Sequence, residues 1–192
     1  MKITRGKLRS IIKEILLLES APIDRATLED IIDTAINRLG LGSVSNLRNF
    51  MIEIANAESG HNPGGLDQIT HYKPNPFQVT QGAIEALSRR GDKSSNPHTE
   101  EMRATFNDTE ATVEPWKDQK PDDVKSNKWL SAVAAVMYIM SELKGNAISG
   151  TVRGRAAQWE RLYNREAALI DNPEDSSEKT ESQIEMYVRK NS

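Results

Sequence analysis

The segment 127–144 constrains the fold more than any other part of the chain, because its apolar side chains leave almost no polar face. Their spacing follows the helical repeat, and the middle of the segment is apolar nearly all round. A helix of this kind is normally covered on every side by other elements. We therefore predict a central buried helix, whose apolar residues are Trp129, Leu130, Val133, Val136, Met137, Met140 and Leu143.

Two amphipathic helices are predicted one after the other between Asp24 and Glu58. Asp24 is a candidate N-cap for the first, and Gly40 is placed to end it. The next is expected to begin near Ser43 or Ser45 and to end at Glu58. Both carry apolar residues at helical spacing, so each should turn one face to the core.

Between residues 60 and 80 the helical spacing disappears, and Gly, Pro, Asn and Asp accumulate. Residues 68–72 are candidates for a small hairpin. A fourth helix capped by Thr80 and another after Gly150 complete the pattern of a mainly α domain over residues 23–170. With 37% hydrophobic and 28% charged residues, the chain can form one core of ordinary size.

Three segments stand outside this pattern. Residues 1–22 are expected to form a basic amphipathic helix. Residues 91–126 are polar and carry three prolines, so we expect a partly ordered insertion. Residues 171–192 contain six acidic and three basic residues and are predicted to be a loosely attached acidic tail, with one short helix around Ile184, Tyr187 and Val188.

The composition argues against several classes of function. A net charge of -3 is unlike that of a general nucleic-acid-binding domain. No apolar run reaches the roughly 18 residues that a membrane span needs, and Lys13 and Glu14 interrupt the apolar stretch near the N-terminus, so we expect no signal peptide. The chain has no cysteine, and His61, His71 and His98 lack the spacing of metal ligands. We expect no catalytic metal and no cofactor.

Glu58 is the most informative polar residue, because the apolar stripe of its helix leads to it. Ile54 and Ala55 lie four and three residues before Glu58, which places its carboxyl group on the core-facing side of the last helical turn. A carboxyl group in this position either caps the helix or pairs with an arginine, or it is a general acid whose pKa is raised by partial burial. The residues around it bear on this choice.

The string Glu58-Ser59-Gly60-His61-Asn62-Pro63 resembles the E-S-x-x-N-P signature of lysozyme-like lytic transglycosylases. In that family the catalytic Glu ends a helix, and a G-L-M-Q block follows after a short loop. Here Asn75-Pro76-Phe77-Gln78 takes that place, with Gln78 matching the glutamine. Tyr138 matches the tyrosine of the family's long buried helix, and Tyr163-Asn164 matches its final Tyr-Asn pair. The resemblance covers about residues 45–170.

The resemblance implies an α+β lysozyme-like fold and cleavage of the β-1,4 bond between N-acetylmuramic acid and N-acetylglucosamine in peptidoglycan glycan strands. Glu58 would protonate the leaving oxygen and then deprotonate the muramoyl C6 hydroxyl, which closes a 1,6-anhydro ring without water. Ser59, Gln78, Tyr163 and Asn164 would bind the sugar or orient the acid. The chain departs from the family at Asn75 and Pro76, after Asn164, and in the insertion 91–126.

Hydrolysis is the alternative within the same superfamily. Asp67 follows Glu58 by nine residues, as in the phage-type muramidase pattern, but Lys73 stands where that pattern has a threonine. If Asp67 held a water molecule opposite the scissile bond, the enzyme would be an inverting muramidase. An Asp in a loop rich in Gly and Pro is also a common turn former.

The opening Met-Lys-Ile-Thr-Arg resembles the start of proteins from tailed phages. Together with the lysozyme-like blocks, it suggests a phage protein found in the virion, or in the host cytoplasm before release, that acts on the bacterial cell wall. The N-terminal helix would then dock to other virion proteins. A non-catalytic virion component on a lysozyme-like scaffold is the competing hypothesis.

Overall fold

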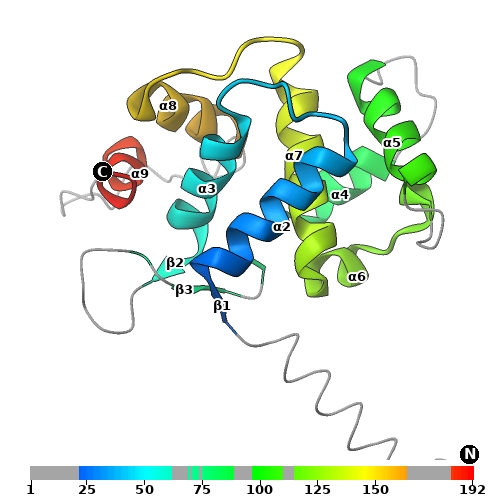
Figure 1. The fold of residues 1–192 in the computed structure, drawn as a ribbon, viewed down its shortest axis with the longest axis horizontal. Coiled ribbons are helices and arrows are strands. Elements are labelled where there is room, and N and C mark those ends of the chain that lie inside the picture. Colours follow the sequence, from blue (N-terminus) through cyan, green and yellow to red (C-terminus); the bar gives the residue numbers. More distant parts are fainter. Residues whose placement is uncertain are drawn as a thin grey trace, which may run out of the picture.

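The computed structural model describes residues 22–61, 69, 71–73, 75–88, 97–109, 115–163 and 183–192. These residues form eight α-helices, one 3-10 helix and a three-stranded sheet, so the protein is mainly α, as the sequence predicts (Figure 1). The predicted N-terminal helix over residues 1–22 lies almost entirely outside the described residues. None of the described helices combines the length and the apolar character needed to cross a membrane.

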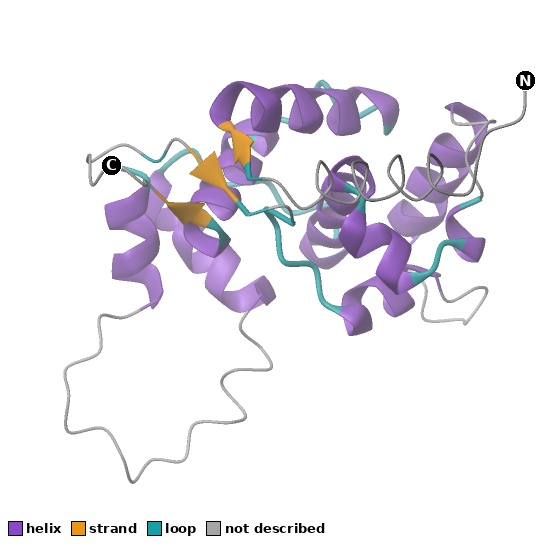
Figure 2. Cartoon of the chain, turned by 90° about the horizontal axis from the view of Figure 1, so that it is seen from below, coloured by secondary structure: helices purple, strands orange, loops and turns teal. Residues whose placement is uncertain are grey.

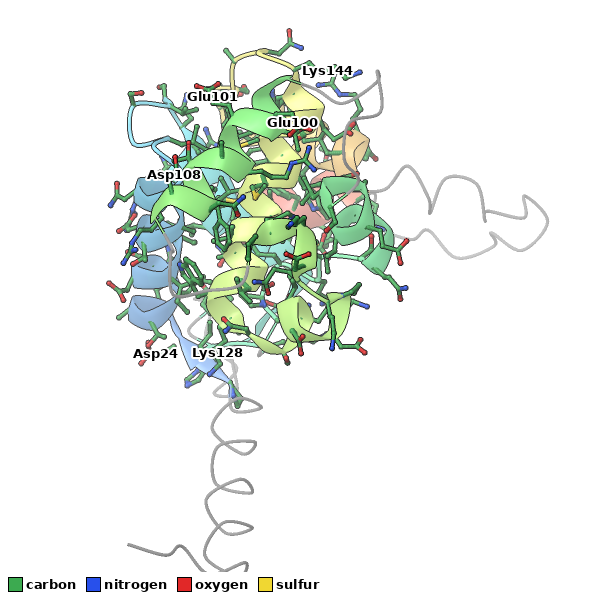
Figure 3. The ribbon with its side chains drawn as sticks, turned by 90° about the vertical axis from the view of Figure 1, so that its right-hand side faces the viewer. Asp24, Glu100, Glu101, Asp108, Lys128 and Lys144 are labelled. Carbon is green, nitrogen blue, oxygen red and sulfur yellow. The ribbon has the colours of Figure 1, made fainter. Side chains whose placement is uncertain are left out.

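The predicted central helix is confirmed as α7, Lys128–Leu143. The side chain of Asn127 caps it by accepting hydrogen bonds from the backbone N–H groups of Trp129, at 3.0 Å, and Leu130, at 3.1 Å. An unbroken run from Leu130 to Met137 is buried. Figure 3 shows Lys128 and Lys144 at the two ends of α7, with other helices packed along it.

Helices α2, Arg25–Arg38, and α3, Leu47–Glu58, form as predicted in position and length. Asp24 accepts a hydrogen bond from the N–H of Thr27 at 2.7 Å, which confirms it as the N-cap of α2. Gly40, with φ of 69°, follows the end of α2 in the left-handed conformation that favours glycine. Helix α3 begins after Asn46, slightly later than the sequence suggests.

Three short strands form one small antiparallel sheet: β1, Ile23–Asp24, β2, Gly60–His61, and β3, His71–Tyr72. Their order is β1-β3-β2, with Tyr72 opposite both Ile23 and Gly60 (Figure 2). Strand β2 follows α3 almost directly, so the sheet lies at the end of the helix that carries Glu58. Of the segment 68–72 expected to form a small hairpin, His71 and Tyr72 form β3, but they pair with β1 and β2 rather than with other residues of that segment.

The segment predicted as a polar insertion is largely helical where it is described. Helix α5, Pro97–Thr109, the 3-10 helix η1, Trp116–Asp118, and helix α6, Pro121–Ser126, follow one another. Helices α5 and α6 pack against α7, and η1 packs against α5. Helix α4, Gln81–Ser88, also packs against α7, and Thr80 caps it through its hydroxyl group at 3.2 Å. Figure 3 shows Glu100, Glu101 and Asp108 spaced along α5. The buried residues of the segment include Met102, Phe106, Trp116 and Val124.

The C-terminal helix corrects a second expectation. Helix α9, Gln183–Lys190, forms around Ile184, Tyr187 and Val188 as predicted, but it packs against α3 and against α8, Val152–Tyr163 (Figure 1). Tyr187 is completely buried. For residues 183–192 the prediction of a loosely attached tail is therefore wrong. The buried ring of Tyr187 and polar partners far away in the sequence stabilise residues 183–192, which carry one acidic and two basic side chains.

Candidate active site

Glu58 is the last residue of α3, and its side chain is half-buried. Two hydrogen bonds from Ser59 close the last turn of the helix. The N–H of Ser59 donates to Ala55 O at 3.0 Å, and the Ser59 hydroxyl donates to the same carbonyl at 3.2 Å. Ser59 is buried. These two hydrogen bonds hold the end of the helix, directly beside Glu58.

Gly60 allows strand β2 to lie against the last turn of α3. A Cβ atom at this position would come within 2.7 Å of Asn56 O and 2.7 Å of the Ile69 Cγ2 atom. Real side chains do not approach backbone so closely, so any other residue would move the strand or the helix end. The glycine of the Glu-Ser-Gly segment therefore sets the path of the chain immediately after Glu58.

The carboxyl group of Glu58 contacts Trp159 of α8, whose indole Nε1–H donates to Oε1 at 2.9 Å. Burial raises the pKa of Glu58, while this hydrogen bond and the positive charges of Lys190 and Lys73 lower it in part. Burial is the largest of these effects. Among the described residues, the partner of the carboxyl group is thus a neutral indole rather than an arginine, and the pKa moves in the direction that suits a general acid.

Gln78 lies next to the end of α3, on the loop between β3 and α4. Its neighbours Phe77 and Val79 are buried, while Gln78 itself is exposed and has a φ of 46°. Left-handed backbone is costly for a glutamine and is often found at functional sites. The Gln78 side-chain amide donates to the backbone carbonyl of Glu58. The structure therefore brings these two predicted site residues together, through the backbone of Glu58 rather than its carboxyl group.

Helix α7 fixes the two neighbouring parts of the site. Ser131 donates from its hydroxyl group to Asn75 Oδ1 at 2.6 Å, which attaches the loop that carries Gln78. Tyr138 donates from its hydroxyl group to Leu162 O at 3.2 Å, which attaches the end of α8. Asn75 is one of the positions at which the sequence departs from the transglycosylase pattern, and here it has a structural partner.

Three predicted site residues cannot be placed in full. Tyr163 is the last residue of α8, one position after Leu162, but its side chain lies outside the described part of the chain. Asn164 and Asp67 lie entirely outside the described residues. Among the residues that are described, no three His, Asp or Glu side chains gather in a way that could hold a metal ion.

Two residues at the site were not identified from the sequence as site residues. Trp159 lies four residues before Tyr163 and therefore on the same face of α8, but it is not part of the transglycosylase blocks. Lys190 of α9 donates from Nζ to Ala57 O at 2.8 Å, and burial lowers its pKa. Nothing local in the sequence links residue 190 to residue 57, so Lys190 had no detectable signal.

Comparisons of the chain with protein-family models, with curated proteins and with solved structures found no match.

Proposed function

We propose that this protein is a peptidoglycan-cleaving glycosidase, and specifically a lytic transglycosylase in which Glu58 is the general acid and then the general base. The observation that carries the proposal is the environment of Glu58. Its half-buried carboxyl group ends α3, accepts a hydrogen bond from a neutral indole and has a pKa raised by burial. The sequence blocks around Gln78 and Tyr163 add the resemblance to the transglycosylase pattern.

In the proposed reaction, protonated Glu58 gives its proton to the glycosidic oxygen as the bond from that oxygen to the muramoyl C1 breaks. The resulting carboxylate then takes the proton of the muramoyl C6 hydroxyl, whose oxygen bonds to C1 and closes the 1,6-anhydro ring. Glu58 is protonated again at the end, so the cycle needs no second carboxylate and no water. The raised pKa favours the first step, because it keeps the carboxyl group protonated at higher pH.

The neighbouring residues have supporting roles in this proposal. Trp159 fixes one carboxyl oxygen of Glu58, Gln78 donates to the backbone carbonyl of Glu58, and Ser59 donates to the carbonyl of Ala55 in the same helical turn. Tyr163 and Asn164 are proposed to contact the sugar, as the resemblance implies. The substrate is the glycan strand of the cell wall, and docking to phage virion proteins through the N-terminal helix remains part of the same hypothesis.

Zymography on purified peptidoglycan tests whether the chain cleaves glycan at all. Wild-type protein should clear the substrate, and Glu58→Gln should lose roughly 10²–10⁴-fold of the rate, the usual contribution of a general acid. Glu101→Gln is the matched control, because Glu101 is exposed on α5 and should leave clearing unchanged. Inactivity of the wild type would favour the non-catalytic scaffold, and equal clearing by Glu58→Gln would remove Glu58 from the mechanism.

A further inference from the structure

The C-terminal helix α9 is anchored by a buried polar cluster. Tyr187 donates from its hydroxyl group to Glu53 Oε2 at 3.0 Å, and Glu53 also forms an ion pair with Arg155 of α8 at 2.6 Å. All three side chains are buried. Burial, and the neighbouring Glu53 carboxylate, raise the pKa of Tyr187, so its hydroxyl group stays protonated and able to donate. Buried groups with satisfied partners of this kind fix one arrangement of α3, α8 and α9.

The end of α9 also binds the backbone of α3. Asn191 donates from Nδ2 to Glu53 O at 3.1 Å and accepts from Asn56 Nδ2 at 2.6 Å. Lys190 donates from Nζ to Ala57 O at 2.8 Å. The last carbonyl groups of a helix have no partner within it, and a cation beside them is favourable. Lys190 is such a partner for the carbonyl group of Ala57, the residue before Glu58.

Helix α9 also packs against Trp159, the residue that donates a hydrogen bond to the Glu58 carboxyl group. The rings of Tyr187 and Trp159 have their centroids 5.1 Å apart, with an angle of 38° between their planes. Trp159 in turn donates to Glu58 Oε1. Helix α9 therefore reaches Glu58 by two routes: through Lys190 to the backbone beside it, and through Tyr187 and Trp159 to its carboxyl group.

We infer that α9 is a working part of the candidate active site and that Lys190 is its positioning residue, which fixes the end of α3 and supplies a positive charge beside the Glu58 carboxyl group. This inference rests on the proposed role of Glu58. It assigns a role in the site to residues far from the transglycosylase blocks, at the other end of the sequence.

The charges around Glu58 give the sign of the expected effect. Among the described groups, Lys190 and Lys73 lower its pKa electrostatically, and the Trp159 hydrogen bond lowers it further, all against burial. Lys190 acts more strongly than Lys73, and Arg189 next to it lowers the pKa of Lys190 itself. Removal of the Lys190 charge should therefore let Glu58 keep its proton to higher pH.

The Trp159 indole offers a readout that does not depend on activity. In the ¹⁵N-labelled full chain, the indole N–H signal of Trp159 should shift with pH as Glu58 titrates, and Glu58→Gln should abolish that shift and so identify the signal among the three tryptophans. We expect Lys190→Gln and Lys190→Met to move the midpoint to higher pH and Lys190→Arg to leave it near the wild-type value. Lys144→Met, at the far end of α7, is the control and should change nothing (Figure 3).

The pH profile of wall cleavage should respond in the same direction, with the alkaline limb of both neutral variants moved to higher pH and that of Lys190→Arg unchanged. A midpoint of the indole titration that is the same in wild type, Lys190→Gln and Lys190→Met would overturn the inference. If the wild type cleaves no peptidoglycan, the proposed function fails, while the indole titration still decides whether Lys190 acts on Glu58.

Discussion

At the scale of single residues, three hydrogen-bond donors hold Glu58 and the residue before it. Trp159 donates to the carboxyl group, Gln78 to the backbone carbonyl of Glu58 and Lys190 to the carbonyl of Ala57. These donors come from three separate parts of the chain. These contacts keep the carboxyl group partly away from solvent. Its pKa is raised because burial outweighs the groups that stabilise the carboxylate.

The raised pKa predicts how Glu58 affects stability. Between the ordinary glutamate pKa of about 4.3 and the raised value, the native state binds more protons than the unfolded state, so the free energy of unfolding falls as pH rises through this window. At neutral pH Glu58→Gln should therefore be more stable than wild type, by roughly 0.5–2 kcal/mol as at other functional sites. The gain should disappear in acid, where Glu58 is protonated in both states.

Thermal unfolding followed by circular dichroism across this pH range measures the difference, and Glu101→Gln is the exposed control. A gain for Glu58→Gln that grows towards acid pH would contradict the direction of the pKa shift, because it would mean that the native state favours the carboxylate.

At the scale of elements, the contact between α3 and strand β2 depends on Gly60. Gly60→Ala would place a Cβ atom 2.7 Å from Asn56 O, and should destabilise the fold by about 1–3 kcal/mol, the usual cost of overpacking. Gly150→Ala is the matched control, because no atom lies within 4 Å of the added Cβ atom. Denaturant unfolding measures both. Equal stability of the two variants would show that the close approach at Gly60 is not a constraint.

The docking of α9 depends on the buried ion pair between Arg155 and Glu53. Arg155→Met leaves the Glu53 carboxylate buried without its counter-charge and should cost about 3–5 kcal/mol. Arg153→Met is the control on the same helix, because Arg153 forms an exposed ion pair with Glu185 of α9 at 2.8 Å, a type worth about 0–1 kcal/mol. Similar losses of stability for the two variants would contradict the view that the buried cluster anchors α9.

At the scale of the whole molecule, the sequence predicts the elements whose signals are local. Asp24, the stripe of α7 and the end of α3 at Glu58 follow from capping and periodicity, and each is present. Helix α5 was missed because its apolar residues, such as Met102 and Phe106, are sparse in a polar segment. The docking of α9 was missed because Tyr187 and Lys190 find their partners on α3, more than 130 residues earlier, and periodicity carries no information on such contacts.

In the candidate site, too, some features have a local signal in the sequence and others depend on long-range packing. The carboxyl group and its place at a helix end could be read from residues 54–60, and the approach of Gln78 agrees with the order of the sequence blocks. The indole of Trp159 and the cation of Lys190 depend on how α8 and α9 pack, so they emerge only from the folded chain. The sequence thus indicates Glu58 as the residue for which we propose the acid role, and the fold determines the environment that shifts its pKa.

Mass spectrometry of the fragments released from purified peptidoglycan distinguishes a transglycosylase reaction through Glu58 from hydrolysis. We expect fragments that end in 1,6-anhydro-N-acetylmuramic acid from wild type and from Glu101→Gln, and almost none from Glu58→Gln. Fragments with ordinary reducing ends would instead indicate hydrolysis, with Asp67 as the first residue to replace. The same anhydro fragments released at the same rate by Glu58→Gln, or no release by any of the proteins, would show that Glu58 is not the general acid of a lytic transglycosylase.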